Sequence, residues 1–218
     1  MIAHAESAAG GLKMACLCIT GGIACGKTAV GRCLAARGVT VIEADEVCHA
    51  LLQPGREVHD RVVREFGPGI LASTGAIDRQ LLGKVVFHDR RLLGRLNELM
   101  HPPAREFIQR RLRELTGLAA VIIPLLYEVG WEADWETVVC VSAPHELQRR
   151  RLAGRGLEPA AAAERLAAQW PVEVKMRRAD HVIYNSGSME ALERQTLFLW
   201  QRWLVMQEKE RNGRKETQ

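Results

Sequence analysis

A run of small and polar residues near the start of the chain has the composition of a phosphate-binding loop. Residues 21–28 read GGIACGKT, which fits the pattern G-x-x-x-x-G-K-[ST] in full. Glycines let successive backbone N–H groups turn inward around phosphate oxygens, because no Cβ atom stands in the way. Lys27 is long enough to reach the β- and γ-phosphates of a nucleoside triphosphate, and Thr28 offers a hydroxyl to Mg²⁺. The segment therefore predicts a nucleoside-triphosphate site.

The surroundings of this loop agree with the pattern. An apolar run at 15–20 predicts a buried strand before it, and residues 27–37 predict a helix after it, whose positive N-terminal end favours phosphate. The sequence contains no N-K-x-D segment for guanine and no H-R-D or D-F-G of protein kinases, which favours ATP. The predicted nucleotide-binding residues are Gly21, Gly22, Ile23, Ala24, Cys25, Gly26, Lys27 and Thr28, with Thr28 also the predicted metal ligand.

A carboxylate pair follows the next expected strand, at 39–43. Glu43 and Asp45 end that strand, and ligands of open α/β sheets bind beyond the carboxyl ends of strands. Asp45 is therefore expected beside the loop, where it could accept a proton from an attacking hydroxyl or orient Mg²⁺. The spacing alone equally allows Asp45 to be the N-cap of the helix expected at 46–52.

The elements that must position these residues alternate between strands and helices. Further strands are expected at 119–123, 137–142 and 181–184, which predicts an α/β fold with a central parallel sheet covered on both faces. Residues 56–116 show almost no strand signal and predict a helical insertion. The expected helices are 56–66, 79–87, 89–115 with an interruption at His101-Pro102-Pro103, 144–153, 159–170, 172–178 and 189–207.

Composition limits the class of protein without choosing a partner. The 218 residues are 47% hydrophobic with a formal net charge of +4, which suits a globular protein that binds polyanions. Residues 1–14 lack the layout of a secretory signal and are expected to be a flexible leader, and no stretch is apolar enough to span a membrane. Six cysteines without a C-x-x-C pair favour a reduced, cytoplasmic setting.

Eight segments follow one another along the chain in an order that can be compared with known families. They are TGGIACGKT (20–28), EAD (43–45), GAIDRQLL (75–82), HP (101–102), IPLLYE (123–128), QRRRLAGR (148–155), RLAAQ (165–169) and K-x-x-x-A-D-x-V-I-x-N (175–185). In this order they resemble the dephospho-CoA kinase family, over residues 15 to about 200. The resemblance implies a three-layer P-loop fold with a helical substrate domain and a helical lid. It also implies transfer of the ATP γ-phosphate to the ribose 3′-hydroxyl of dephospho-CoA, the last step of coenzyme A synthesis.

The resemblance also implies boundaries and roles. The nucleotide-binding core would comprise 15–55, 117–147 and 180–207, the dephospho-CoA-binding insertion 56–116, the lid 148–179 and a polar tail 208–218. Asp45, Lys27 and Arg151 would be catalytic, and Arg155 and Asn185 would contact the nucleotide. The expected acceptor-binding residues are Asp45, Arg79, His101, Pro124, Leu125 and Leu126. Mg-ATP and dephospho-CoA are the expected ligands, with neither nucleic acid nor membrane as a partner.

Simpler interpretations of these residues stay open. His101 could mark a helix kink, and Asp78-Arg79 could cap a helix. Glu128 could bond backbone or help the metal, Asn185 could be a turn residue, and Arg149 and Arg150 fit a solvated face. Arg151 and Arg155, four apart, are expected on one helix face. Trp131, Trp135, Trp200 and Trp203 are expected to serve packing.

Two departures from the family pattern concern the metal. Glu43 stands where the family usually has Asp, and Ile122 stands where some members have an acid. Two other functions remain as alternatives. One is a kinase of nucleoside monophosphates or other small metabolites. The other is a P-loop ATPase switch that binds nucleic acid through the basic stretch 105–113, although no aromatic cluster accompanies that charge.

Overall fold

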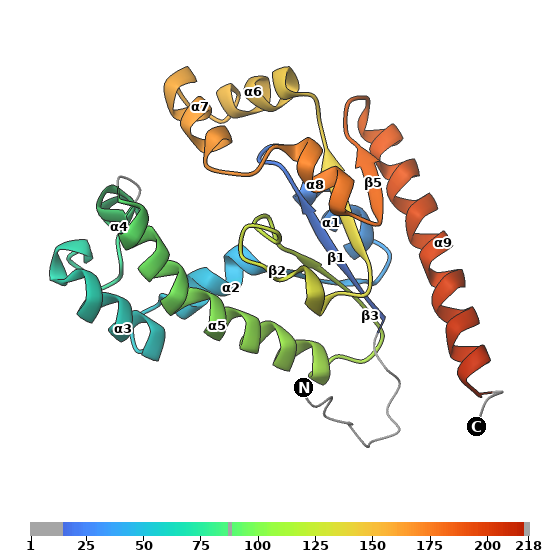
Figure 1. Cartoon of the computed structure of the whole chain (residues 1–218), viewed down its shortest axis with the longest axis horizontal. Helices are drawn as coiled ribbons and strands as arrows, with labels where there is room; N and C mark the ends of the chain where they lie inside the picture. The colour runs from blue at the N-terminus through green and yellow to red at the C-terminus, as the bar shows by residue number, and fades with distance from the viewer. Residues whose placement is uncertain (1–14, 87–88, 216–218) are drawn as a thin grey trace.

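The structure is a computed structural model that describes residues 15–86 and 89–215. The predicted leader lies outside these residues. A parallel five-stranded sheet with the order β2-β3-β1-β4-β5 forms the centre (Figure 1). Its strands are β1 (Ala15–Gly21), β2 (Thr40–Glu43), β3 (Leu118–Ile122), β4 (Val138–Ser142) and β5 (His181–Tyr184). All five predicted strands are thus confirmed, and none of their ends differs from the prediction by more than one residue.

The central strand is buried on both faces, which explains its continuous apolar sequence. In β1, Leu17 and Ile19 face one apolar cluster, whereas Cys18 belongs to a second cluster on the opposite face. Register is set by pairs such as Ile19 with Ile122 on one side and Thr20 with Cys140 on the other. The loop after β1 therefore leaves the sheet from its middle.

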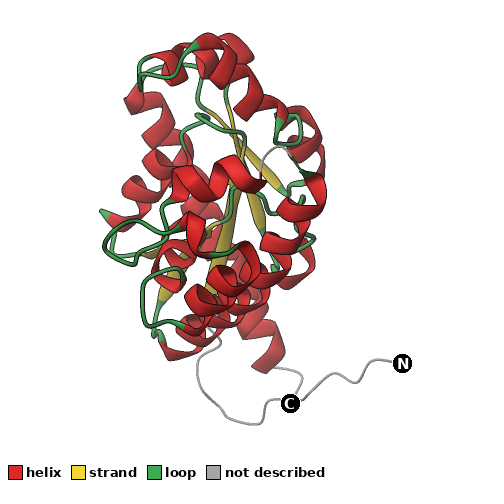
Figure 2. Ribbon diagram, turned by 90° about the vertical axis from the view of Figure 1, so that its left-hand side faces the viewer, coloured by secondary structure: helices red, strands yellow, loops and turns green. Residues whose placement is uncertain are grey.

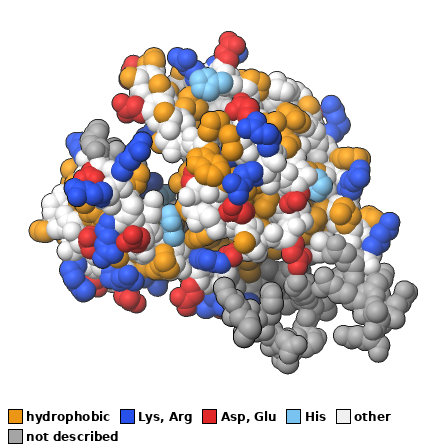
Figure 3. Space-filling model, viewed as in Figure 1, with side chains coloured by type: hydrophobic (Ala, Val, Ile, Leu, Met, Phe, Trp, Pro, Cys, Tyr) orange, Lys and Arg blue, Asp and Glu red, His pale blue; other side chains and the backbone are white. Residues whose placement is uncertain are grey.

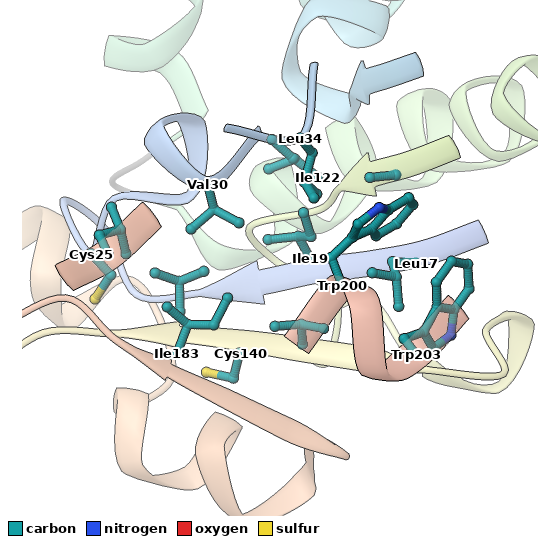
Figure 4. Packing of buried hydrophobic residues seen from close by; sticks show 14 of the residues in the cluster. Leu17, Ile19, Cys25, Val30, Leu34, Ile122, Cys140, Ile183, Trp200 and Trp203 are labelled. Carbon is teal, nitrogen blue, oxygen red and sulfur yellow. The ribbon is translucent and has the colours of Figure 1, made fainter. Parts of the chain in front are cut away.

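Helices cover both faces of the sheet (Figure 2). α1 and α9 pack on the face of Leu17 and Ile19, where Trp200 and Trp203 close the cluster (Figure 4). α2 and α5 pack on the face of Cys18. The helices are α1 (Lys27–Ala35), α2 (Ala44–Leu51), α3 (Glu57–Phe66), α4 (Arg79–Val86), α5 (Arg90–Glu114), α6 (His145–Ala153), α7 (Pro159–Ala167), α8 (Val172–Arg178) and α9 (Met189–Lys215), with short 3₁₀ turns at Pro68–Ile70 and Glu132–Asp134.

The expected interruption of α5 is wrong. Pro102 and Pro103 lie inside a helix that runs without a break from Arg90 to Glu114, although each proline removes a backbone donor. Burial on both sides of the pair stabilises the continuous helix, since α5 contributes to the insertion's core before the prolines and to the sheet's core after them. The buried residues on the two sides are Leu99, Met100, Ala104 and Ile108.

Other predicted helix ends are also corrected. α9 continues to Lys215 rather than ending at 207, and α7 ends at Ala167 rather than at 170. The end predicted for α4 at Phe87 lies outside the described residues. The predicted packing roles of Trp200 and Trp203 are confirmed, because their side chains are buried with ring centroids 5.0 Å apart.

Two helical units flank the loop end of the sheet. α3, α4 and the first half of α5 enclose a separate apolar cluster that includes Val62, Ile70 and Leu82. α6 and α7 share a much smaller cluster around Leu152 and Ala162. Figure 3 shows that the surface is hollowed between these two units, which places an open groove next to the loop that follows β1.

Candidate active site

The backbone conformation and the packing around the loop require glycine at its two ends. Gly21 has φ 140°, and a Cβ atom there would lie 2.1 Å from the carbonyl oxygen of Val141 on β4. Gly26 has φ 102°, and a Cβ atom there would lie 2.1 Å from Nδ2 of Asn185. Ala24 also has a left-handed φ of 57°. The pattern in the sequence thus corresponds to a tightly wound loop with no space for side chains at its ends.

Two residues from distant parts of the chain hold the outside of this loop. Asn185 Nδ2 donates to the carbonyl oxygen of Cys25 at 2.9 Å, and Arg151 Nη1 donates to that of Ala24 at 3.0 Å. Arg151 Nη2 also donates to the backbone and side-chain oxygens of Asn185, both at 3.1 Å. These contacts fix the loop backbone at Ala24 and Cys25 from residues more than a hundred positions away in the sequence.

These contacts were not predicted. The catalytic role expected for Arg151 and the nucleotide contact expected for Asn185 both stay predictions. Asn185 is buried and bonded to the loop, so the interpretation as a simple turn residue is wrong. The expectation that Arg151 and Arg155 share a helix face is also wrong, because α6 ends at Ala153 and Arg155 lies in the exposed turn that follows.

Lys27 opens α1 and folds back over its own loop. Its Nζ donates to the carbonyl oxygens of Gly21 at 3.0 Å and Gly22 at 2.9 Å. The pKa of Lys27 is lowered to about 8, mainly by burial and with a contribution from the positive charge of Lys175, while Cys25 and Asp45 act in the opposite direction. Thr28 follows in the first turn of α1 with an exposed side chain. The ammonium and hydroxyl groups that the motif predicts are therefore both at the mouth of the loop.

Asp45 does not cap a helix. α2 begins at Ala44, its N-cap is Glu43, and no side chain caps it, so Asp45 stands inside the first turn with an exposed carboxylate. Because the sheet is parallel, Asp45 after β2 lies at the same edge of the sheet as the loop after β1. The pKa of Glu43 is raised, first by burial and then by the charges of Glu46 and Asp45. Asp45 thus offers an exposed carboxylate at the sheet edge that carries the loop, with the end of β3 between the ends of β2 and β1.

The predicted acceptor-binding residues differ in exposure. Arg79 is exposed at the start of α4, where the neighbouring Asp78 caps the helix by accepting from Gln80 N at 2.8 Å, as one interpretation expected. Leu125 is 37% exposed, whereas Leu126 is fully buried and can only support the segment from within. Asp45, Leu125 and Arg79 therefore offer surface to a ligand directly.

His101 lies in the middle of α5 with its ring edge-on to Trp131, at a centroid distance of 5.8 Å. Burial lowers the pKa of His101, so the ring is neutral near pH 7. Trp131 was expected only to pack, and it does so in the core cluster under α5. It also contacts the His101 ring edge-on, a contact that the sequence did not indicate.

Sequence reasoning missed Lys175 altogether. Its side chain is fully buried, and Nζ lies 2.7 Å from Glu128 Oε1 and donates to the carbonyl oxygen of Pro124 at 2.7 Å. Glu128 Oε1 also accepts from the backbone N–H of Trp170 at 2.9 Å, which confirms that Glu128 bonds backbone. The only signal was the lysine that opens the K-x-x-x-A-D string, to which no role had been given.

The fold and the phosphate-binding loop together define the class of protein. A parallel sheet whose central strand runs into a G-x-x-x-x-G-K-[ST] loop at a helix N-terminus, with helical units on either side, is the architecture of P-loop kinases. A Thermus thermophilus crystal structure covers 88% of this chain and 98% of its own, with TM-score 0.75 and 32% identity. The dephospho-CoA kinase from Campylobacter jejuni covers 86% and 96%, with TM-score 0.65 and 27% identity.

The sequence comparisons specify the family. The dephospho-CoA kinase profile matches residues 15–191. The dephospho-CoA kinase of Frankia casuarinae is 41% identical over 84% of this chain and 81% of its own length. That of Geobacillus kaustophilus is 38% identical over 85% and 94%. The chain belongs to the dephospho-CoA kinase family, whose members are ATP-using phosphotransferases. Among the helices within the described residues, none is long and apolar enough to cross a membrane.

Proposed function

We propose that this chain transfers the γ-phosphoryl group of ATP to the ribose 3′-hydroxyl of dephospho-CoA, giving ADP and coenzyme A. The observation that carries the proposal is the meeting of three segments at adjacent strand ends. The phosphate-binding loop follows β1, the Pro124–Leu126 segment follows β3, and Asp45 follows β2. A donor phosphate and an acceptor hydroxyl held on these segments meet at one edge of the sheet.

The proposed chemistry is an in-line displacement. Asp45 accepts the proton of the 3′-hydroxyl as its oxygen forms a bond to the γ-phosphorus. The bond between the γ-phosphorus and the bridging oxygen breaks, and ADP leaves with the electron pair. Lys27 releases the carbonyl oxygens of Gly21 and Gly22 and binds the phosphates, since an ammonium group gains more from anionic oxygens than from neutral ones.

The residues at this edge fit a magnesium ion bound with the nucleotide. Within the described residues, no group of three or more His, Cys, Asp or Glu could hold a metal alone. This suits Mg²⁺, which uses one or two protein ligands together with phosphates and water. Thr28 would hold the ion, with Asp45 next to it. The end of β3 supplies no carboxylate, since Ile122 stands there and is buried in the core. The ion would neutralise charge on the phosphates.

The flanking units complete the proposal. The insertion 56–116 binds dephospho-CoA through Arg79 and His101. Leu125 contributes from the Pro124–Leu126 segment after β3, which forms a wall of the acceptor site. The lid 148–179 brings Arg155 toward the nucleotide, and Arg151 acts beside it while holding the loop. Closure over the groove would exclude water from the phosphoryl transfer. Six unpaired cysteines support a reducing, cytoplasmic setting.

The test follows ADP release from Mg-ATP with dephospho-CoA, with AMP and without an acceptor. The wild type is compared with Asp45→Asn and with Glu46→Gln, a control that changes an exposed carboxylate in the same turn. We expect release that depends on dephospho-CoA, a fall in kcat of about 10²- to 10⁴-fold in Asp45→Asn, and little change in the control. Turnover with AMP alone would contradict the substrate, and an active Asp45→Asn would contradict the base.

A further inference from the structure

Lys175 carries a charge in a place where charges are costly. It lies on α8 with no exposed surface, and a buried ammonium is tolerated only when it is paired and hydrogen-bonded. Both partners come from the segment after β3, namely Glu128 Oε1 and the carbonyl oxygen of Pro124, each 2.7 Å from Nζ. Replacing such a pair by apolar side chains is often neutral or stabilising, so stability alone is a weak reason for it.

Glu128 connects this lysine to the end of the predicted lid. One carboxylate oxygen accepts from Lys175 and from the backbone N–H of Trp170, the residue where the chain returns from α7 to α8. The Trp170 ring in turn stacks on Tyr127 at a centroid distance of 6.4 Å, with Arg178 over both rings. These contacts of Trp170 therefore join the connection between α7 and α8 to the segment after β3, which includes Pro124–Leu126.

The same lysine connects that segment to the phosphate-binding loop. The carbonyl oxygen of Pro124 accepts from Lys175 and also from Thr20 Oγ1, at 3.4 Å. Thr20 immediately precedes Gly21, whose carbonyl oxygen is bonded to Lys27. A continuous series of contacts thus runs from the end of the lid, through the wall after β3, to the lysine that binds phosphate.

We propose that the Lys175–Glu128 ion pair positions the Pro124–Leu126 wall against the phosphate-binding loop and the returning lid segment, so that the acceptor hydroxyl is held in line with the γ-phosphate. The pair touches neither reactant and acts through the wall. The inference rests on the proposed function, because it assumes that this wall binds dephospho-CoA. It predicts that loss of the pair impairs use of the acceptor much more than binding of ATP.

The test compares Lys175→Met, Glu128→Gln and the double variant, with the exposed neighbour Arg177→Met as control. Urea unfolding reports stability, and steady-state kinetics report kcat and the KM values for ATP and dephospho-CoA. Each single variant leaves one buried group without its partner and is expected to lose stability, whereas the double variant regains most of it. In the double variant we expect kcat/KM for dephospho-CoA to remain about ten- to a hundredfold low, with KM for ATP within about threefold of wild type.

Two results would overturn the inference. A stable double variant with wild-type kcat/KM for dephospho-CoA would show that the pair is only structural. Equal losses for both substrates would show a general disturbance of the site. The wild type, measured beside the variants, distinguishes failure of the ion-pair inference from failure of the proposed function. A wild type that does not phosphorylate dephospho-CoA overturns both, while an active wild type with an unimpaired double variant overturns the ion pair alone.

Discussion

His101, which we propose to lie on the acceptor side, shows how a single side chain depends on its surroundings. The imidazole lies edge-on to Trp131 and is half-buried in the middle of α5. Burial lowers the pKa of His101 below its ordinary value, so the folded state binds its proton less readily than the unfolded chain does. A neutral ring near pH 7 can donate and accept a hydrogen bond, which suits contact with a ribose or amide group.

This pKa shift predicts a pH dependence of stability. Below the ordinary histidine pKa of about 6.5 the unfolded state holds more protons than the folded state, so this residue makes stability fall as pH falls. Urea unfolding of wild type and His101→Gln between pH 5 and pH 8 measures the effect. We expect the wild type to lose more stability on acidification than the variant does. Parallel curves would mean that His101 has the same pKa in both states.

At the scale of elements, the phosphate-binding loop depends on its contact with the end of β5. Gly26 combines a left-handed φ of 102° with a Cβ position only 2.1 Å from Asn185 Nδ2. Gly38, in the turn after α1, has φ 81° with nothing within 4 Å of its Cβ position. Substitution of Gly38 therefore tests backbone strain alone, whereas substitution of Gly26 tests the same strain together with a collision with Asn185.

Gly26→Ala and Gly38→Ala are predicted to differ. Gly38→Ala should cost about 1–2 kcal/mol of unfolding free energy from left-handed strain and leave ATP binding unchanged. Gly26→Ala adds displacement of Asn185 from the Cys25 carbonyl, so we expect a larger loss of stability and a rise of at least about tenfold in KM for ATP. Equal effects of the two changes on ATP binding would contradict the role of this contact.

α9 is the element that closes one face of the sheet. Trp203 is 2% exposed, packs against Trp200 and donates from Nε1 to Thr137 Oγ1 at 3.3 Å, whereas Phe198 on the same helix is 66% exposed. Trp203→Ala should lower the free energy of unfolding by about 3–5 kcal/mol because it leaves a cavity. Phe198→Ala should change it by less than about 0.5 kcal/mol. Denaturant unfolding of both variants decides whether α9 is part of the core.

At the scale of the whole molecule, the three helical regions differ in how much apolar surface holds them. The sheet is covered on both faces by large clusters, and the insertion has a cluster of its own. Within the described residues, α7 buries Ala162 alone, and it shares a small cluster with Leu152. Regions with few buried apolar contacts open at the lowest free energy, so the α6–α7 unit is the part best suited to move.

Hydrogen exchange tests this difference. The amides of α7 should exchange far faster than those of β1, with α5 closer to β1. A nonhydrolysable ATP analogue together with dephospho-CoA should slow exchange in α7 much more than in α5, because closure orders the lid. Protection of α7 equal to that of β1 without ligands would contradict a mobile lid. Unchanged exchange on addition of both ligands would contradict closure.

Much of the molecule follows from local sequence. The five strands are predictable because buried parallel strands read as short apolar runs. The phosphate-binding loop is predictable because its glycines, lysine and threonine are close together in the sequence. Contacts within or next to the loop explain Gly21, Gly26 and Lys27. Local signals fail where burial competes with them. Two prolines predict a break at 102–103, yet α5 continues because it is anchored in a core on either side.

The contacts that join the segments of the site were decided only by the tertiary structure. Arg151 reaches a carbonyl 127 positions away and Lys175 one 51 positions away, and their partners are backbone oxygens, which every residue has. No spacing or composition marks such an acceptor, so the sequence could name these residues but not what they touch. It determined the strands, the loop and the candidate carboxylate at Asp45. Folding decided how that loop is held open and how the wall and the lid are tied to it.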